Sequence, residues 1–257
     1  MMNYKIISIA NQKGGVGKTA TTVNLAAALT KLNKRILVID MDPQANVSRA
    51  FGLEVDKLDK TISEAIKGMC DINDCLVKIY ENLYVIPSNL FLSGINFENT
   101  NYNSKPELFL KQLIDSIKEK FDFIFIDCPP SLAFLTLSCF IASNSIIVPI
   151  QCEFFSLQSI TQLLALINKV QKNFNSDLRI EGFLLTMYDA KTNLSNEVSV
   201  QIRSLFKENT YFTFIPRNIS IAEGLAKGVP VIKYKPKSAG SLAYITLAKE
   251  FLEKQRY

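Results

Sequence analysis

The chain has 257 residues, a formal net charge of +5, 48% hydrophobic residues and 21% charged residues. These values indicate a globular protein with a full core and exclude a disordered or collagen-like chain. Five cysteines without a C-x-x-C pair, and no histidine at all, argue against a zinc site and exclude histidine-dependent catalysis. No apolar run reaches the roughly 18 residues of a spanning helix, and no signal peptide precedes the first strand, so we expect a cytoplasmic protein.

A glycine-rich loop follows the first predicted strand. An apolar run beginning at Ile6 leads into the sequence NQKGGVGKT, and an amphipathic helix is predicted from Lys18 to about Leu32. A strand, loop and helix in this order bind phosphate, because glycines let backbone N–H groups approach phosphate oxygens. We expect Lys18 to contact the β- and γ-phosphates and the hydroxyl of Thr19 to bind Mg²⁺. The predicted nucleotide-binding residues of the loop are Gly14, Gly15, Val16, Gly17, Lys18, Thr19 and Ala20.

The loop carries a second lysine, Lys13, and Gln12 stands where the usual phosphate-loop pattern has its first glycine. A ligand-free glycine loop is the alternative interpretation, but two lysines facing no anion would repel each other. The run from Lys13 to Thr19 resembles the deviant Walker A motif of the ParA/MinD family of ATPases. This resemblance implies that Lys13 acts across a dimer interface, so that two chains enclose two ATP molecules.

A buried strand is predicted over 35–40, and the sequence DMDPQAN begins at its last residue, Asp40. Polar groups at the carboxyl end of such a strand should meet the phosphate-binding loop. The residues alone leave three roles open for Asp42: orienting water, holding Mg²⁺ through water, or capping a short helix over 47–51, which Asn46 could also cap. The segment resembles switch I of the family, which implies that Asp42 positions the attacking water.

A second apolar strand, predicted over 121–127, ends in Asp127. An apolar strand ending in aspartate is the Walker B arrangement, in which the carboxylate holds Mg²⁺, usually through a water. The alternative is that Asp127 caps a helix that begins at Ser131. The sequence CPPS that follows Ile126 and Asp127 resembles the family's switch II, which senses the γ-phosphate.

Strands and helices alternate along the rest of the chain. This alternation is typical of an α/β fold with one doubly wound, mostly parallel sheet and helices on both faces. We therefore expect a single phosphate-loop NTPase domain over residues 1–257, and the roughly ten residues before the loop leave no room for an N-terminal helix-turn-helix. The remaining predicted strands are 83–86, 145–150, 180–187 and 211–215, and the remaining predicted helices are 61–66, 106–120, 157–174, 196–208 and 241–254.

Two further segments match the family. The triplet Pro216, Arg217 and Asn218 resembles the segment that contacts the nucleotide base, and Asn218 could also cap the helix that follows. The stretch 151–155 resembles a family segment near the dimer interface.

Lysines gather toward the C-terminus. Lys233, Lys235 and Lys237 would share one face of an extended segment over 231–237, with Lys227 nearby. Together with Lys191 they are candidates for contacts with DNA phosphates. An equally weighted alternative is that lysines on an exposed edge strand prevent association between sheets.

The motifs at 13–19, 40–46, 127–131 and 216–218 occur in the order found in short, Soj-like ParA partition ATPases. The resemblance implies a cytoplasmic, nucleoid-associated homodimer that uses ATP and Mg²⁺ and binds DNA nonspecifically. It also implies release from DNA when a ParB-type partner stimulates ATP hydrolysis, with no membrane partner. One alternative is a MinD-like membrane-cycling ATPase, disfavoured because no terminal amphipathic extension is visible. Another is an iron–sulfur reductase resembling the nitrogenase iron protein, for which Cys128 gives slight support.

Overall fold

One seven-stranded sheet runs through the structure. The computed structural model describes residues 4–97, 100–102, 104–153 and 156–255, and within them the strands follow the order β3-β4-β2-β5-β1-β6-β7. All neighbouring strands are parallel except β3 and β4. The strands are β1 (Lys5–Ile9), β2 (Ile36–Asp40), β3 (Val77–Tyr80), β4 (Leu83–Ile86), β5 (Phe123–Asp127), β6 (Ser145–Gln151) and β7 (Arg179–Thr186). The predicted mostly parallel sheet is confirmed.

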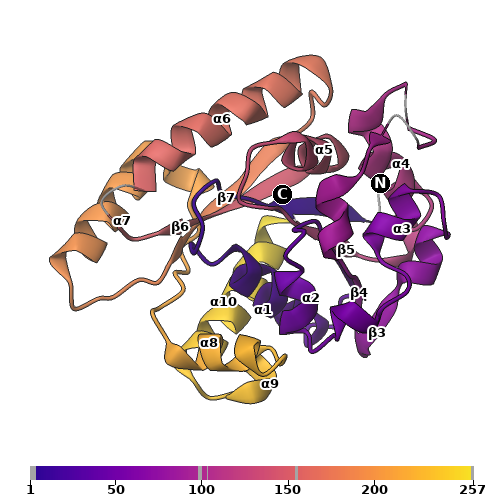
Figure 1. Cartoon of the computed structure of the whole chain (residues 1–257). Coiled ribbons are helices and arrows are strands. Elements are labelled where there is room, and N and C mark those ends of the chain that lie inside the picture. The colour runs from indigo at the N-terminus through magenta and orange to yellow at the C-terminus, as the bar shows by residue number, and fades with distance from the viewer. Residues whose placement is uncertain (1–3, 98–99, 103, 154–155, 256–257) are drawn as a thin grey trace.

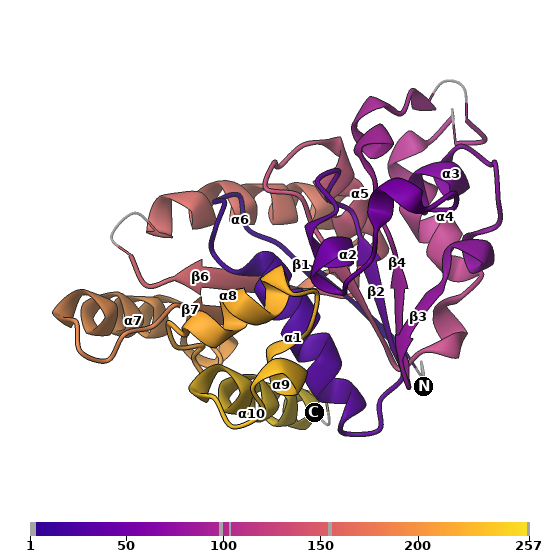
Figure 2. The same cartoon turned by 60° about the horizontal axis from the view of Figure 1, so that its bottom comes forward.

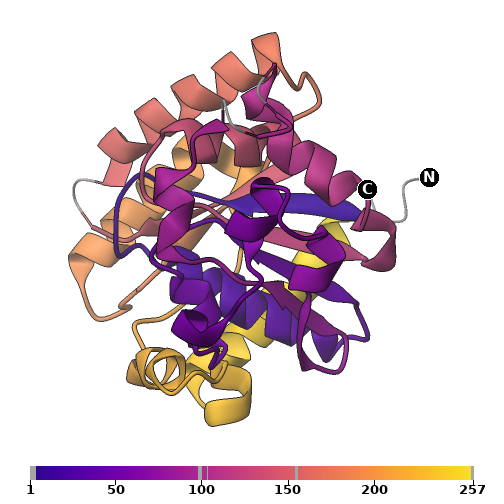
Figure 3. The same cartoon turned by 45° about the vertical axis from the view of Figure 1, so that its right-hand side comes forward.

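Helices cover both faces of this sheet. They are α1 (Lys18–Thr30), α2 (Asn46–Ala50), α3 (Ile62–Ile66), α4 (Phe109–Asp115), α5 (Phe134–Ala142), α6 (Ser156–Asn173), α7 (Asn193–Phe206), α8 (Ile219–Ala226), α9 (Val231–Tyr234) and α10 (Ala239–Lys254). Helices α1, α2 and α8 to α10 pack on one face and α3 to α7 on the other (Figures 1 and 3). Among the helices that the structure describes, none has both the length and the apolarity to cross a membrane. The α/β fold of phosphate-loop NTPases is confirmed.

Alternate residues of the central strands supply two separate cores. Ile36 and Val38 of β2 pack with α1, whereas Leu37 and Ile39 pack in the core that contains α3 to α6. All five residues of β2 are buried. A strand covered on both faces needs apolar residues at every position, which explains the continuous apolar runs in the sequence.

The carboxyl ends of β1, β2 and β5 meet at one edge of the sheet. Asp127 at the end of β5 is the register partner of Ile9 in β1 and of Asp40 in β2. β1 lies between β5 and β6, so the strand order reverses here, and this is where doubly wound sheets bind ligands. From this edge α1 runs back along the sheet and packs against α9 and α10 (Figure 2).

The extended conformation considered for 231–237 is wrong. Val231 and Ile232 are both buried, which a strand with one exposed face does not allow, and they belong to the short helix α9. The backbone N–H of Val231 donates to Oδ1 of Asn24 in α1 at 2.7 Å, which fixes the start of α9. Lys233, Lys235 and Lys237 therefore do not share one face of a strand.

The predicted strand 211–215 is also wrong. Tyr211 and Ile215 each bond to β7, but the backbone N–H groups of Phe212 and Thr213 donate to the carboxylate of Glu250 in α10 instead. These two N–H groups therefore bond to a side chain of α10 and not to a neighbouring strand. In the described residues the isolated β-bridges lie on either side of the segment, at Thr210 and Pro216.

Two further differences concern helices and a strand. The helix predicted over 106–120 is shorter: α4 spans Phe109–Asp115, and 3₁₀ turns occupy 106–108 and 118–120. Strand β3 has no strong alternation of apolar and polar residues, so the sequence does not predict it.

The helix predicted over 61–66 is confirmed as α3, and Thr61 and Glu64 form a capping box at its start.

Candidate nucleotide-binding site

Two neighbouring strands hold the loop between β1 and α1. Asn11 donates from Nδ2 to the carbonyl oxygen of Pro149 in β6 at 2.7 Å, and its Oδ1 accepts the backbone N–H of Lys13 at 3.0 Å. Thr186, the last residue of β7, donates from its hydroxyl to the carbonyl oxygen of Val16 at 2.8 Å. These contacts preorganise the loop, which reduces the ordering that ligand binding must otherwise supply.

The backbone of the loop requires glycine at two positions and leaves one side open. Gly15 has φ +77° and Gly17 has φ +88°, in the left-handed region that favours glycine. A Cβ placed on Gly14 would meet no atom of the described residues within 4 Å. Helix α1 begins directly afterwards, and no described side chain caps its first turn. Backbone N–H groups at the start of such a helix, which here has 13 residues, favour an anion.

Lys18 lies inside this site. Its side chain is buried, and burial lowers the pKa of the ammonium while the charges of Asp127 and Asp42 act in the opposite direction. Nζ donates to the carbonyl oxygen of Lys13 at 3.3 Å. A phosphate group in the loop would supply the nearby negative charge that a buried ammonium needs.

Two buried carboxylates lie below the loop. Burial raises the pKa of Asp127 to about 8, and the charge of Asp40 adds to this effect. Burial also raises the pKa of Asp40 to about 6. Asp127 accepts hydrogen bonds from the hydroxyl of Thr22 at 2.6 Å and from that of Thr19 at 3.3 Å. At neutral pH a bound cation would favour the ionised form of both carboxylates.

The residues of this cluster fit a magnesium ion. Mg²⁺ prefers hydroxyl, carboxylate and water oxygens, and the hydroxyl of Thr19 and the carboxylate of Asp127 lie side by side. The structure thus brings the two predicted metal residues together. The alternative role of Asp127 as a helix cap is wrong, because α5 begins only at Phe134 and its N-cap position is Ala133.

Asp42 lies at the rim of the same cluster. Its Oδ1 accepts the backbone N–H of Gln44 at 2.9 Å, which fixes a tight turn directly after β2. Neither Asp42 nor Asn46 caps α2 in the part of the chain described, since Ala45 occupies the N-cap position with φ +54°. Asp40 instead anchors this helix, because its Oδ2 accepts the N–H and the hydroxyl of Ser48 at 2.9 and 2.7 Å.

The second lysine of the loop lies outside this cluster. Nζ of Lys13 pairs with Oε2 of Glu153 at 2.9 Å, and the two side chains are 33% and 44% exposed. Lys13 and Lys18 therefore occupy different environments, one at the surface and one buried. Glu153 belongs to the stretch 151–155 that matched the family, of which residues 154 and 155 lie outside the described residues.

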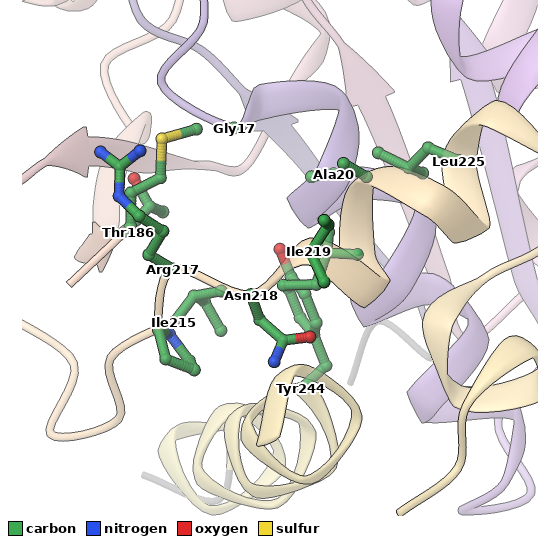
Figure 4. Close-up of a pocket in the computed structure, with 13 residues that line it drawn as sticks. Gly17, Ala20, Thr186, Ile215, Arg217, Asn218, Ile219, Leu225 and Tyr244 are labelled. Carbon is green, nitrogen blue, oxygen red and sulfur yellow. The ribbon is translucent and has the colours of Figure 1, made fainter. Parts of the chain in front are cut away.

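A cavity of about 410 Å³ adjoins the loop (Figure 4). Pro216, Arg217 and Asn218 form one wall, and Gly17 and Ala20 form another. Its remaining lining is mostly apolar, from Ile215, Ile221, Leu225 and Tyr244 among others. An apolar slot beside a phosphate site suits a flat heterocycle such as a nucleotide base. The structure therefore brings the predicted base-contacting triplet next to the predicted phosphate loop. Asn218 occupies the N-cap position of α8 but makes no capping hydrogen bond to the described residues.

Comparisons with known proteins agree with this geometry. A family model described as an AAA domain matches residues 4–180. The sporulation initiation inhibitor protein Soj of Bacillus subtilis (strain 168) is 43% identical over 96% of this chain and 97% of the relative. The chain belongs to the ParA/Soj family. The resemblance inferred from the motifs is confirmed.

Solved structures show the same fold for other members of this wider group. The cobyrinic acid a,c-diamide synthase of Mycobacterium smegmatis with bound ATP analog and magnesium has a TM-score of 0.87 and 33% identity, covering 98% of this chain and 96% of that chain. The cell division ATPase MinD of Pyrococcus furiosus has a TM-score of 0.79 and 30% identity, covering 97% and 98%. The ParA/Soj and MinD proteins thus share one architecture.

The five lysines considered for DNA contacts lie at two places in this ParA/Soj chain. Nζ of Lys227 and Nζ of Lys235 lie 4.9 and 5.5 Å from the ring centroid of Tyr234, and Lys235 also pairs with Glu223 at 3.2 Å. Lys233 lies over the ring of Tyr80 in β3, at 3.5 Å. Lys237 is exposed just after them, and Lys191 is exposed in the loop after β7. Four of the five lysines thus cluster around α9, and Lys191 comes from a different element.

Several residues of the site were missed by sequence reasoning. Thr22 holds Asp127, and Asn11 and Thr186 hold the loop. Two of them carried a usable signal. Thr22 lies one helical turn after Lys18, and Thr186 lies at the carboxyl end of a predicted strand. Neither position is part of a motif.

Proposed function

We propose that this ParA/Soj family member is a DNA-segregation ATPase built as a single domain. It binds ATP and Mg²⁺, closes into a homodimer that binds DNA nonspecifically, and leaves the DNA when a ParB-type partner stimulates hydrolysis. The observation that carries the proposal is the separation of the two lysines of one loop. Lys18 is only 7% exposed and interacts with the charge of Asp127. Lys13 lies at the surface, where it pairs with Glu153.

Each residue of the phosphate site has a distinct role in this proposal. The loop N–H groups and Lys18 bind the phosphates, and Lys18 stabilises the charge that develops on the leaving phosphate oxygens. Thr19 and Asp127 hold Mg²⁺, which neutralises phosphate charge when bound. Asp42 orients the attacking water, since its turn with Gln44 holds the carboxylate at the rim of the cluster. The cavity beside Pro216 takes the base.

The dimer follows from the position of Lys13. A lysine that is one-third exposed and paired with a surface carboxylate can exchange that partner for an anion on a second chain at small cost. In the closed dimer Lys13 then contacts the phosphates bound by the other chain. This arrangement makes closure depend on ATP.

DNA binding follows from the lysines around α9. Lys227, Lys233, Lys235 and Lys237 are exposed on one short stretch that packs against α1, the helix that follows the phosphate loop. Closure joins two such surfaces, and doubling the phosphate contacts raises the affinity and steepens its dependence on salt. The proposed location of the protein is therefore the nucleoid.

The deciding experiment is a DNA mobility-shift assay with ATP and Mg²⁺, with ADP and Mg²⁺, and without nucleotide. We expect a shift with ATP that is independent of DNA sequence and weakens as salt rises. Replacing Lys227 and Lys235 by Ala should reduce binding at fixed ATP. Equal binding under the three nucleotide conditions would contradict the proposal.

The MinD-like alternative predicts a different binding partner. Its support is the similarity in fold to the Pyrococcus MinD structure. Pelleting with anionic lipid vesicles in the presence of ATP distinguishes the two functions. ATP-dependent recovery with vesicles, together with no shift of DNA, would favour the membrane function.

The iron–sulfur alternative finds little support in the positions of the cysteines. A cluster shared between two subunits needs sulfur atoms at a common surface. Cys128 and Cys139 are fully buried and Cys152 is 5% exposed.

A further inference from the structure

Two of the five cysteines meet in the segment that follows α3. Sγ of Cys70 and Sγ of Cys75 are 3.5 Å apart. Cys70 is partly exposed, whereas Cys75 is fully buried. An accessible thiol beside a buried one is the arrangement of a redox-active pair, in which the first sulfur reacts and the second resolves the product.

The backbone on both sides of the pair is fixed by local hydrogen bonds. Helix α3 ends at Ile66 with Lys67 as its C-cap residue, and Gly68 with φ +71° turns the chain back. Asp71 then starts the short 3₁₀ turn 72–75, because its Oδ1 accepts the backbone N–H of Asn73 at 2.8 Å. The fold of the backbone therefore places the two cysteines next to each other.

The environment of Cys75 gives the two thiols different reactivities. Its Sγ lies 3.2 Å from the carbonyl oxygen of Thr61, which accepts the thiol hydrogen. Burial raises the pKa of the Cys75 thiol, and its contact with Cys70 adds to this effect. Cys75 therefore stays protonated while both cysteines are reduced, and the exposed Cys70 is the thiol that a reagent from solvent meets first.

We propose that Cys70 and Cys75 form a reversible dithiol–disulfide site that exchanges with low-molecular-weight disulfides of the glutathione class. The Cys70 thiolate attacks one sulfur of the small disulfide, a mixed disulfide forms, and one small thiolate leaves. Cys75 then gives its proton to solvent, its sulfur attacks Sγ of Cys70, and the second small thiol leaves. Two protein thiols are oxidised and one small disulfide is reduced to two thiols, so that two electrons and two protons are transferred.

The second step needs only a small movement. A disulfide bond is about 2.05 Å long, so the sulfur atoms, now 3.5 Å apart, must approach by roughly 1.5 Å. Only the four residues 71–74 separate the two cysteines, and side-chain rotation with a slight shift of this turn supplies the approach. In doing so Cys75 gives up its contact with Thr61, at the capped start of α3.

The other cysteines provide internal controls. Cys128 and Cys139 are fully buried, and Cys152 is 5% exposed. A reagent that reacts only through solvent should leave these three reduced while the native fold persists. The proposed reaction is therefore specific to one pair.

The test uses the native full-length chain and oxidised glutathione. After incubation the thiols are blocked with N-ethylmaleimide, the protein is denatured and digested with trypsin, and the peptides are weighed. Lys67 and Lys78 flank the pair, so one peptide, 68–78, carries both cysteines. We expect this peptide to be unblocked and lighter by two hydrogen atoms, and to return to the doubly blocked form when a reductant precedes the block.

Two variants separate the two roles. Cys75→Ser should accumulate a stable glutathione adduct on Cys70, because no resolving thiol remains. Cys70→Ser should leave Cys75 unreacted. If either variant fails to fold, the wild-type digest still decides the matter. A doubly blocked 68–78 peptide after incubation, or a lasting adduct on wild-type Cys70, would overturn the proposal.

Discussion

Asp127 and Asp40 make the stability of the ligand-free protein depend on pH. Its pKa is raised to about 8 and that of Asp40 to about 6, in each case first by burial. The unfolded chain loses these protons near the ordinary value of about 3.9, whereas the folded chain keeps them to higher pH. The stability from this source is fully present below about pH 4 and is lost as the pH rises through about 6 and then about 8.

The first prediction follows from this loss of stability with rising pH. Asp127→Asn cannot ionise, so the difference in melting temperature between variant and wild type, measured without Mg²⁺ or nucleotide, should grow in favour of the variant as the pH rises from about 5 to about 8. For a chain of this size each kcal/mol corresponds to about 2–4 °C. Thermal denaturation monitored by circular dichroism gives the difference. A gap that stays constant with pH would show that Asp127 is already ionised in the folded protein.

The second prediction concerns Thr22, whose hydroxyl donates to Oδ1 of Asp127 at 2.6 Å. This bond lowers the pKa of Asp127, against the effect of burial. Thr22→Val removes it, so the carboxylate should hold its proton more tightly and bind Mg²⁺ more weakly. A hydrogen bond to a charged group is worth about 1.5–3 kcal/mol, which corresponds to a loss of roughly tenfold or more in Mg²⁺ affinity.

Magnesium titrations of ATP binding measure this loss. It should shrink between about pH 7 and about pH 9, because high pH ionises Asp127 in both proteins. Thr30→Val is the matched control, since Thr30 lies in the same helix and donates to the carbonyl oxygen of Ala27 at 2.9 Å. The Thr22 assignment fails if both variants behave alike.

At the scale of elements, the sequence patterns identified the buried parts of the sheet and failed at its margins. Strands β2 and β5 are continuous apolar runs because both of their faces are buried. The segments 211–215 and 231–237 depend on partners distant in sequence. Glu250 accepts the N–H groups of one, and Asn24 binds the start of the other. A local pattern contains no information about such partners.

The third prediction tests a close contact between two elements. The turns that follow α2 and α8 approach each other at Gly52 and Gly228. A Cβ on Gly228 would lie 2.5 Å from Cα of Gly52, and Gly228 also has φ +68°. Gly228→Ala should therefore destabilise the protein by roughly 2 kcal/mol or more.

Denaturant unfolding measures this change, and Gly94→Ala is the control. A Cβ on Gly94 would meet no described atom within 4 Å, and the residue lies in an exposed 3₁₀ turn. The control should change stability by less than about 0.5 kcal/mol. If both substitutions changed the free energy of unfolding equally, the close contact at Gly228 would not explain the loss of stability.

At the scale of the whole molecule, the motifs predicted the residues that would contact phosphate and Mg²⁺, but they did not predict the residues that hold the loop in place. Lys18, Thr19 and Asp127 were placed together from spacing and strand order alone, and the structure brings them within one cluster. Asn11 and Thr186 act through single bonds to backbone carbonyl oxygens in other elements. Such bonds become visible only when the strands have been placed side by side.

The fourth prediction separates the two lysines of the loop in the assembled protein. Lys18→Ala should lose ATP binding, because it removes the buried cation of the chain's own site. Lys13→Ala should keep ATP binding by the monomer and lose ATP-dependent dimerisation, because its lysine is proposed to act on the partner chain. Fluorescent-nucleotide titration measures the first property, and light scattering with ATP and Mg²⁺ measures the second.

The loss of the Lys13 ion pair does not by itself account for such an effect. Its side chains are 33% and 44% exposed, and exposed pairs contribute at most about 1 kcal/mol. The melting temperature of Lys13→Ala should therefore stay near that of the wild type. A normal ATP-dependent dimer in this variant would show that Lys13 does not act between chains. A loss of ATP binding equal to that of Lys18→Ala would instead place Lys13 in its own chain's site.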